Sequence, residues 1–168
     1  MIMSKESPKR SRGSALSECY MRFIREVVAP LVEAHVPGGG RTLLYQREPN
    51  FRCHLPGTGH LLVHKHRDSD YYHQPNELNV WIPLTDCFGS NTLWAESEPL
   101  RGDFHPFLIV YGQMCRFYAN RCRHYTVANT TDRTRVSIDL RVISDQSGGF
   151  KENPRFRLGQ YFTSVTDK

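Results

Sequence analysis

The sequence has no long apolar run. Among its 168 residues, no uninterrupted apolar stretch approaches the ~20 residues that a membrane-spanning helix needs. No apolar block follows the basic residues near the start of the chain, so a secretory signal is not expected. These two absences predict a cytoplasmic protein that has no membrane partner.

Paired cysteines are also lacking. The five cysteines are odd in number and widely spread, and no C-x-x-C pair occurs. This pattern fits reduced thiols better than a disulfide framework or a zinc site. We expect each cysteine to be a small, free side chain, buried more often than reactive.

The excess of basic over acidic residues is small outside the first residues of the chain. The formal net charge is +5 and the pI is about 9.1, but residues 1–13 carry four basic residues against one acidic residue. We interpret residues 1–13 as a disordered basic leader rather than as a nucleic-acid-binding arm. No nucleic-acid partner is expected.

The chain has the length of one ordinary domain and a helix-then-strands pattern. Residues 15–34 carry apolar side chains near helical spacing and predict a helix that Pro30 ends or kinks. After the breaker cluster at 35–40, short apolar or alternating runs predict many short strands, typical of an all-β sandwich or barrel. The predicted strands are 41–47, 51–55, 60–68, 77–83, 91–95, 107–111, 114–118, 122–128 and 134–143. We expect one domain over 14–143, followed by an extension at 144–168 that shows no clear pattern.

Histidines are concentrated in one region, with five of the eight between residues 54 and 73. In the predicted strand 60–68, alternation places His64, His66 and Asp68 on one face, where they would be poor material for a hydrophobic core. A His-x-Asp pair lets an imidazole and a carboxylate reach one metal ion from the same side. A second histidine would complete the two-His, one-carboxylate triad of non-haem Fe(II) oxygenases, which leaves open coordination positions.

The second half of the chain offers that histidine and an anion-binding pair. His124 follows Asp68 by 56 residues and lies in a strand-like segment. Eleven residues further on, Arg135 and Ser137 share one face of the predicted strand 134–143, whose other face is apolar. A guanidinium beside a hydroxyl is well suited to bind a carboxylate.

Three stretches resemble the Fe(II)/2-oxoglutarate-dependent oxygenases, specifically the branch of phytanoyl-CoA hydroxylases and small oxygenases associated with antibiotic biosynthesis. They are HRDSDYYHQPNELNVWIPLT at 66–85, NTLWAESEP at 91–99 and YGQMCRFYANRCRHYTVANTTDRTRVS at 111–137. The resemblance implies a mostly β fold, a double-stranded β-helix of the jelly-roll, cupin-like type, and we expect the N-terminal helix to pack outside one of its sheets.

The resemblance also implies roles for individual residues. It implies three ligands for Fe(II), namely His66, Asp68 and His124. It implies that Arg135, assisted by Ser137, binds the distal carboxylate of the cosubstrate 2-oxoglutarate. Dioxygen would then hydroxylate a small-molecule substrate, with release of succinate and carbon dioxide. Because related halogenases lack the carboxylate ligand, Asp68 favours hydroxylation.

Other residues are weaker candidates. Asn79, which shares a face of the predicted strand 77–83 with Glu77 and Trp81, is expected to line the cavity near 2-oxoglutarate. Aromatic side chains that could contact the substrate are Tyr71 and Trp94. Further histidines that could lie near the metal or elsewhere in the cavity are His64 and His73.

Two alternatives remain open at this point. A cupin-type metalloenzyme would use His64, His66, Asp70 and His124, although Asp70 stands where glutamate is usual and the Pro-x-Gly before the distal histidine is missing. A non-catalytic β-sandwich binding module would need no iron. The sequence does not predict the oligomeric state.

Overall fold

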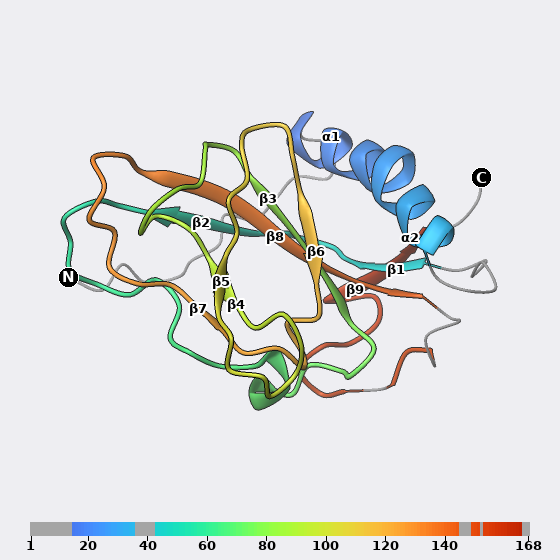
Figure 1. Ribbon diagram of the computed structural model, residues 1–168. Helices are drawn as coiled ribbons and strands as arrows, with labels where there is room; N and C mark the ends of the chain where they lie inside the picture. The colour runs from blue at the N-terminus through green and yellow to red at the C-terminus, as the bar shows by residue number, and fades with distance from the viewer. Residues whose placement is uncertain (1–14, 36–42, 145–148, 152, 166–168) are drawn as a thin grey trace.

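The computed structural model describes residues 15–35, 43–144, 149–151 and 153–165 (Figure 1). The predicted leader, residues 1–13, lies outside the described residues. Within the described part of the chain, no helix is long and apolar enough to cross a membrane.

The described elements follow the predicted order, with helix first and strands after it. Their bounds are α1 (Ala15–Phe23), a π-helical segment (Ile24–Val28), α2 (Ala29–His35), β1 (Leu43–Gln46), β2 (Asn50–His54), a 3-10 turn (Asp68–Tyr71), β3 (Leu78–Pro83), β4 (Trp94–Ala95), β5 (His105–Pro106), β6 (Cys115–Phe117), β7 (His124–Tyr125), β8 (Arg135–Ser144) and β9 (Phe162–Val165).

The strands form two antiparallel sheets. In the larger sheet the order is β6-β3-β8-β1-β9, and β2 also pairs with β8. The smaller sheet has the order β5-β4-β7. The helices lie across the outer face of the larger sheet, while the smaller sheet lies toward its other face (Figure 1). The predicted mostly β fold with an outer N-terminal helix is confirmed.

The ten-residue strand β8 separates the core from the site because its two faces differ. Leu140 and Val142 point outward and pack against the helices, where Ile24 and Val28 are fully buried. The opposite face carries only polar and charged side chains from Arg135 to Arg141, and all of them are buried: Arg135, Ser137, Asp139 and Arg141. This alternation follows from the period of two in a strand.

The helix face that packs on the sheet is narrower than its apolar residues suggest. Ile24, Val28 and Val32 are buried, but Met21 and Leu31 are exposed. The buried positions recur every four residues. Because a regular α-helix has about 3.6 residues per turn, side chains at this spacing would move gradually around the helix axis. The π-helical turn, closed by the bond from the Ala29 N–H to the Ile24 carbonyl, takes more residues per turn and keeps them on one side. Pro30, expected to end or kink the helix, is followed by helix up to His35.

Two predicted strands are wrong. Residues 60–68 run beside β7 without forming a regular ladder, because the Thr126 hydroxyl accepts the amides of Leu62 and Val63 in place of a backbone partner. Regular pairing is reduced to an isolated bridge between His66 and His124. Residues 107–111 form no strand either, and the short strand of that region is β5, a little earlier in the chain.

The C-terminal stretch contributes to the larger sheet. Strand β9 pairs with β1, and its Phe162 is fully buried beside Leu44 and Ile143. Phe156 and Tyr161 of the same stretch contact this small cluster. The sheet therefore uses residues beyond the boundary at 143 that the sequence predicts.

Candidate metal centre and cosubstrate pocket

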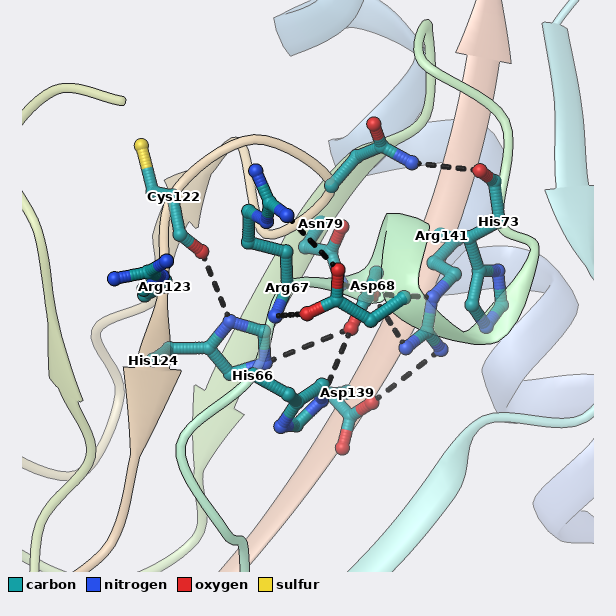
Figure 2. Close-up of polar contacts among 12 residues, drawn as sticks. His66, Arg67, Asp68, His73, Asn79, Cys122, Arg123, His124, Asp139 and Arg141 are labelled. Carbon is teal, nitrogen blue, oxygen red and sulfur yellow. Dashed lines mark hydrogen bonds and ion pairs between the residues drawn. The ribbon is translucent and has the colours of Figure 1, made fainter. Parts of the chain in front are cut away.

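Three side chains that the sequence predicts as metal ligands converge on one point. His66, Asp68 and His124 each offer one ligand atom, and these atoms lie within 4.8 Å of one another. The Nε2 atoms of both histidines are 3.5 Å from Oδ1 of Asp68 (Figure 2). Among the described residues, no other group of three or more histidine, cysteine or carboxylate side chains lies close enough together to hold a metal ion.

Backbone carbonyls orient the two imidazoles. Nδ1 of His66 lies 2.6 Å from the carbonyl of His64, and Nδ1 of His124 lies 3.2 Å from the carbonyl of Cys122. Since a carbonyl only accepts, Nδ1 carries the proton in the neutral form of each ring, which leaves the Nε2 lone pair directed at the centre. Metal-binding histidines are usually fixed in this way.

The two histidines come from segments that meet across the edge of the smaller sheet. The His124 amide donates to the His66 carbonyl at 2.9 Å, and the His66 amide donates back at 3.2 Å. Strand β7 is held from its other side by Glu96, whose carboxylate accepts the amides of Arg123 and Gly102 at 2.7 and 3.1 Å. The buried Glu96 therefore helps to fix the strand that carries His124.

Asp68 begins the 3-10 turn and is almost fully buried. Its amide donates to the Ala119 carbonyl at 2.8 Å. Although burial by itself would raise the pKa of this carboxyl, the hydrogen bond from His66 and the charge of Arg141 hold the pKa well below its usual range. Asp68 is thus a carboxylate at neutral pH.

The donor set fits a divalent metal ion. Burial lowers the pKa of His124 to about 4, so that its imidazole is neutral at pH 7. Burial opposes charge on His66 too, but hydrogen bonds with Asp68 and the His64 carbonyl outweigh it and raise the pKa. Two imidazole nitrogens and one carboxylate oxygen, oriented before any ion arrives, are the ligands of a non-haem iron site.

The three ligands line a cavity of about 270 Å³ that Arg135 also reaches. Arg135 is 1% exposed, donates from Nε to the Asn91 carbonyl at 3.0 Å and from Nη1 to the Ser137 hydroxyl at 2.6 Å, and lies over the Trp81 ring. Burial lowers its pKa to about 10. Among the described residues no carboxylate forms an ion pair with Arg135, and Asp139 on the same face of β8 attracts its charge only from a longer distance.

Of the other candidates from the sequence, some line the cavity and some do not. Asn79, Trp81, Tyr71 and His64 line the cavity. Glu77, Trp94 and His73 do not line it: Glu77 is fully buried and binds His73 at 2.7 Å, and the Trp94 indole nitrogen has no hydrogen-bond partner within the described residues.

The ligand set of the cupin alternative is not brought together. His64 is exposed, and it is its carbonyl, not its ring, that holds His66. Asp70 is exposed and pairs with Arg67 at 3.1 Å.

Sequence reasoning missed three charged residues that line the cavity, namely Arg52, Asp139 and Arg141. Arg52 on β2 donates from Nε to Asp139 at 2.6 Å. Asp139 and Arg141 continue the alternation that placed Arg135 and Ser137 on one face of β8. The signal for them was therefore present in the sequence, whereas the position of Arg52 depends on the pairing of β2 with β8.

The fold and the ligand set resemble those of the Fe(II)/2-oxoglutarate-dependent oxygenases, since two antiparallel sheets face each other with a His-x-Asp…His cluster between them. Solved structures share the fold. The Ni complex of the non-heme monooxygenase ThoJ has a TM-score of 0.57 at 21% identity, covering 79% of this chain and 61% of ThoJ. A prolyl-4-hydroxylase from Pseudomonas putida has a TM-score of 0.55 at 14% identity, covering 80% of this chain and 68% of the hydroxylase.

A third structure, the alpha ketoglutarate dependent epimerase SnoN from nogalamycin biosynthesis, has a TM-score of 0.54 at 18% identity, covering 77% of this chain and 58% of SnoN. No family model matches the sequence. The streptomycin biosynthesis protein StrG of Streptomyces griseus is 37% identical over 158 residues, which span 89% of this chain and 70% of StrG. The chain belongs to the family of StrG. The oxygenase resemblance predicted from the sequence is confirmed.

Proposed function

We propose that the protein is an Fe(II)- and 2-oxoglutarate-dependent dioxygenase that hydroxylates a small molecule and releases succinate and carbon dioxide. The observation that carries this proposal is Arg135. A buried guanidinium without a carboxylate partner in the described structure lies in the same cavity as three preoriented metal ligands. Burying such a charge is costly unless an anion compensates it, and 2-oxoglutarate would bring one.

Iron is held, in this proposal, by His66, Asp68 and His124. When bound, Fe(II) supplies coordination positions for 2-oxoglutarate and dioxygen and couples decarboxylation of the cosubstrate to oxidation of the substrate. The protein's part is to fix the ligands, and the backbone carbonyls behind both histidines do so.

The distal carboxylate of 2-oxoglutarate is bound by Arg135 and Ser137. Nε and Nη1 of Arg135 are already engaged by Asn91 and Ser137, which hold the guanidinium in one plane at the wall of the cavity. A fixed planar donor suits a carboxylate better than a freely rotating ammonium does.

The rest of the cavity is partly apolar and limits the size of the substrate. Apolar side chains of Leu62, Leu93 and Phe117 line it, and Tyr71 covers His66 edge-on at 5.0 Å between ring centroids. A cavity of about 270 Å³ is at the small end for ligand sites. We therefore propose a small-molecule substrate. We also propose that the protein has neither nucleic acid nor membrane as a partner and that it is cytoplasmic.

The names of the relatives support the kind of substrate. StrG is named for streptomycin biosynthesis and SnoN for nogalamycin biosynthesis. We propose that the substrate here is likewise an intermediate of a small natural product. Asp68, the ligand that related halogenases lack, favours transfer of oxygen rather than of halide.

The test combines binding and turnover. Purified protein is titrated anaerobically with Fe(II) and then with 2-oxoglutarate, and succinate and substrate products are followed by mass spectrometry after oxygen is admitted. Succinate formation and one added oxygen atom in the product are expected. A product with the mass of the substrate would point to epimerisation instead, and a protein that bound no divalent metal would overturn the proposal.

A further inference from the structure

Arg141 is a buried cation next to a metal ligand rather than beside the cosubstrate. It lies near the end of β8, is 6% exposed, and reaches Asp68 from the side opposite the two histidines (Figure 2). No motif of the sequence analysis involves it, and its distance along β8 from Arg135 gives it a separate part of the cavity.

The two oxygens of Asp68 have different surroundings. Oδ2 accepts Nε and Nη2 of Arg141 at 3.0 and 2.7 Å and Nδ2 of Asn79 at 3.0 Å. Oδ1 faces the Nε2 atoms of the two histidines. Three donors occupy Oδ2, so only Oδ1 is directed at the point where the ligand atoms meet.

We propose that Arg141 is a positioning residue that restricts Asp68 to metal binding through one oxygen. The inference rests on the proposed function. If both oxygens of Asp68 bound the ion, the carboxylate would take one of the positions that 2-oxoglutarate and dioxygen need. Arg141 therefore preserves the open part of the coordination sphere.

Arg141 is itself held on every side. Nη1 donates to Gln46 at 3.3 Å and to the Tyr161 hydroxyl at 3.2 Å. The carboxylates of Glu77 and Asp139 lie 3.6 and 3.7 Å from Nε and Nη1. With its plane fixed by these contacts, the guanidinium presents Nε and Nη2 to Asp68 in one orientation.

A positioning role and a purely electrostatic role of Arg141 predict opposite changes in metal affinity when Arg141 is removed. A cation beside the site repels a divalent ion, so if charge alone mattered, removing Arg141 would strengthen metal binding. If Arg141 positions Asp68, its removal lets the carboxylate turn away from the point where the ligand atoms meet, and binding weakens. Partners of metal ligands of this kind typically contribute 10- to 100-fold to metal affinity.

The experiment is a calorimetric titration of the full-length apoprotein with Co(II), with the absorption spectrum of the Co(II) form recorded for each protein. Arg141→Met is expected to bind Co(II) about 10- to 100-fold more weakly than wild type. Arg141→Lys, which retains the charge with a single-point donor, is expected to fall between the two and to show an altered Co(II) spectrum.

Arg133→Met is the control. It removes an exposed guanidinium that precedes β8 by two residues and does not line the cavity. Its Co(II) affinity is expected to equal that of wild type. Circular dichroism checks that each variant folds. If Arg141→Met does not fold, Arg141→Lys still tests the proposal.

The results separate this inference from the proposed function. Wild-type binding together with unchanged or tighter binding by both Arg141 variants would overturn the role of Arg141 alone. Unchanged spectra in Arg141→Lys at unchanged affinity would do the same. A wild-type protein that bound no Co(II) would overturn the proposed function first.

Discussion

Replacing Arg135 by lysine tests the cosubstrate site most directly. The substitution keeps one positive charge but loses the planar donor that Asn91 and Ser137 hold in place at 3.0 and 2.6 Å. The loss of one charge-assisted hydrogen bond to a carboxylate costs about 1.5–3 kcal/mol, which corresponds to about a 10- to 150-fold weaker affinity for 2-oxoglutarate. Metal binding should persist because Arg135 is not one of the converging ligands.

The assay is an anaerobic titration of the metal-loaded protein with 2-oxoglutarate, alongside a metal titration of the same variant. Arg133→Lys is the control, since Arg133 precedes β8 by two residues and is exposed. Equal 2-oxoglutarate affinity in Arg135→Lys and wild type would refute the reasoning and leave Arg135 with a structural role. Loss of metal as well as cosubstrate would show that the substitution disrupts the whole site.

Four further outcomes are expected. His124→Ala should abolish metal retention while circular dichroism shows an intact fold, because the side chain lies in the cavity rather than in a hydrophobic cluster. Glu96→Gln should lower the free energy of unfolding by about 1–3 kcal/mol in urea, since an amide nitrogen would face a backbone N–H that the carboxylate now accepts. Leu140→Ala, at a fully buried position, should cost about 2–5 kcal/mol in the same assay. Burial raises the pKa of Cys87 to about 11, so at pH 8 iodoacetamide should modify the exposed Cys19 and spare Cys87, as mass spectrometry of peptides would show.

Patterns confined to one strand were readable from the sequence. The alternation in β8 predicted that Arg135 and Ser137 share a face and that Leu140 and Val142 face the other way, and both are so. The period of two is a property of the strand itself and needs no knowledge of its neighbours. The same rule applied further along β8 would have predicted that Arg141 shares their face.

Contacts between distant segments were not readable in the same way. Residues 60–68 alternate as a strand would, yet the Thr126 side chain takes the place of a backbone partner there. Asp68 reaches His66 because a 3-10 turn begins at Asp68, not because the two alternate along a strand. Likewise, Arg52 meets Asp139 only through the register of β2 against β8. Such pairings are decided by the whole fold.

The helix shows a third kind of departure. Met21 and Leu31 fit a helical apolar pattern but are exposed, since the sheet is contacted by a narrower face. A π-helical turn of five residues shifts the positions after it, and sequence periodicity that assumes a regular α-helix misses such a shift.

The sparse seam between residues 60–68 and β7 has a consequence for stability. His66 and His124 are 58 residues apart in the chain and lie on opposite sides of this seam. The regular β pairing across it is an isolated bridge between these two residues. An ion held by both would act as a reversible staple across it, closing a long loop as a disulfide does. By loop-closure entropy such a cross-link can be worth about 4 kcal/mol. Chelation would then loosen this edge first, and added metal would slow proteolytic cleavage there more than elsewhere in the chain.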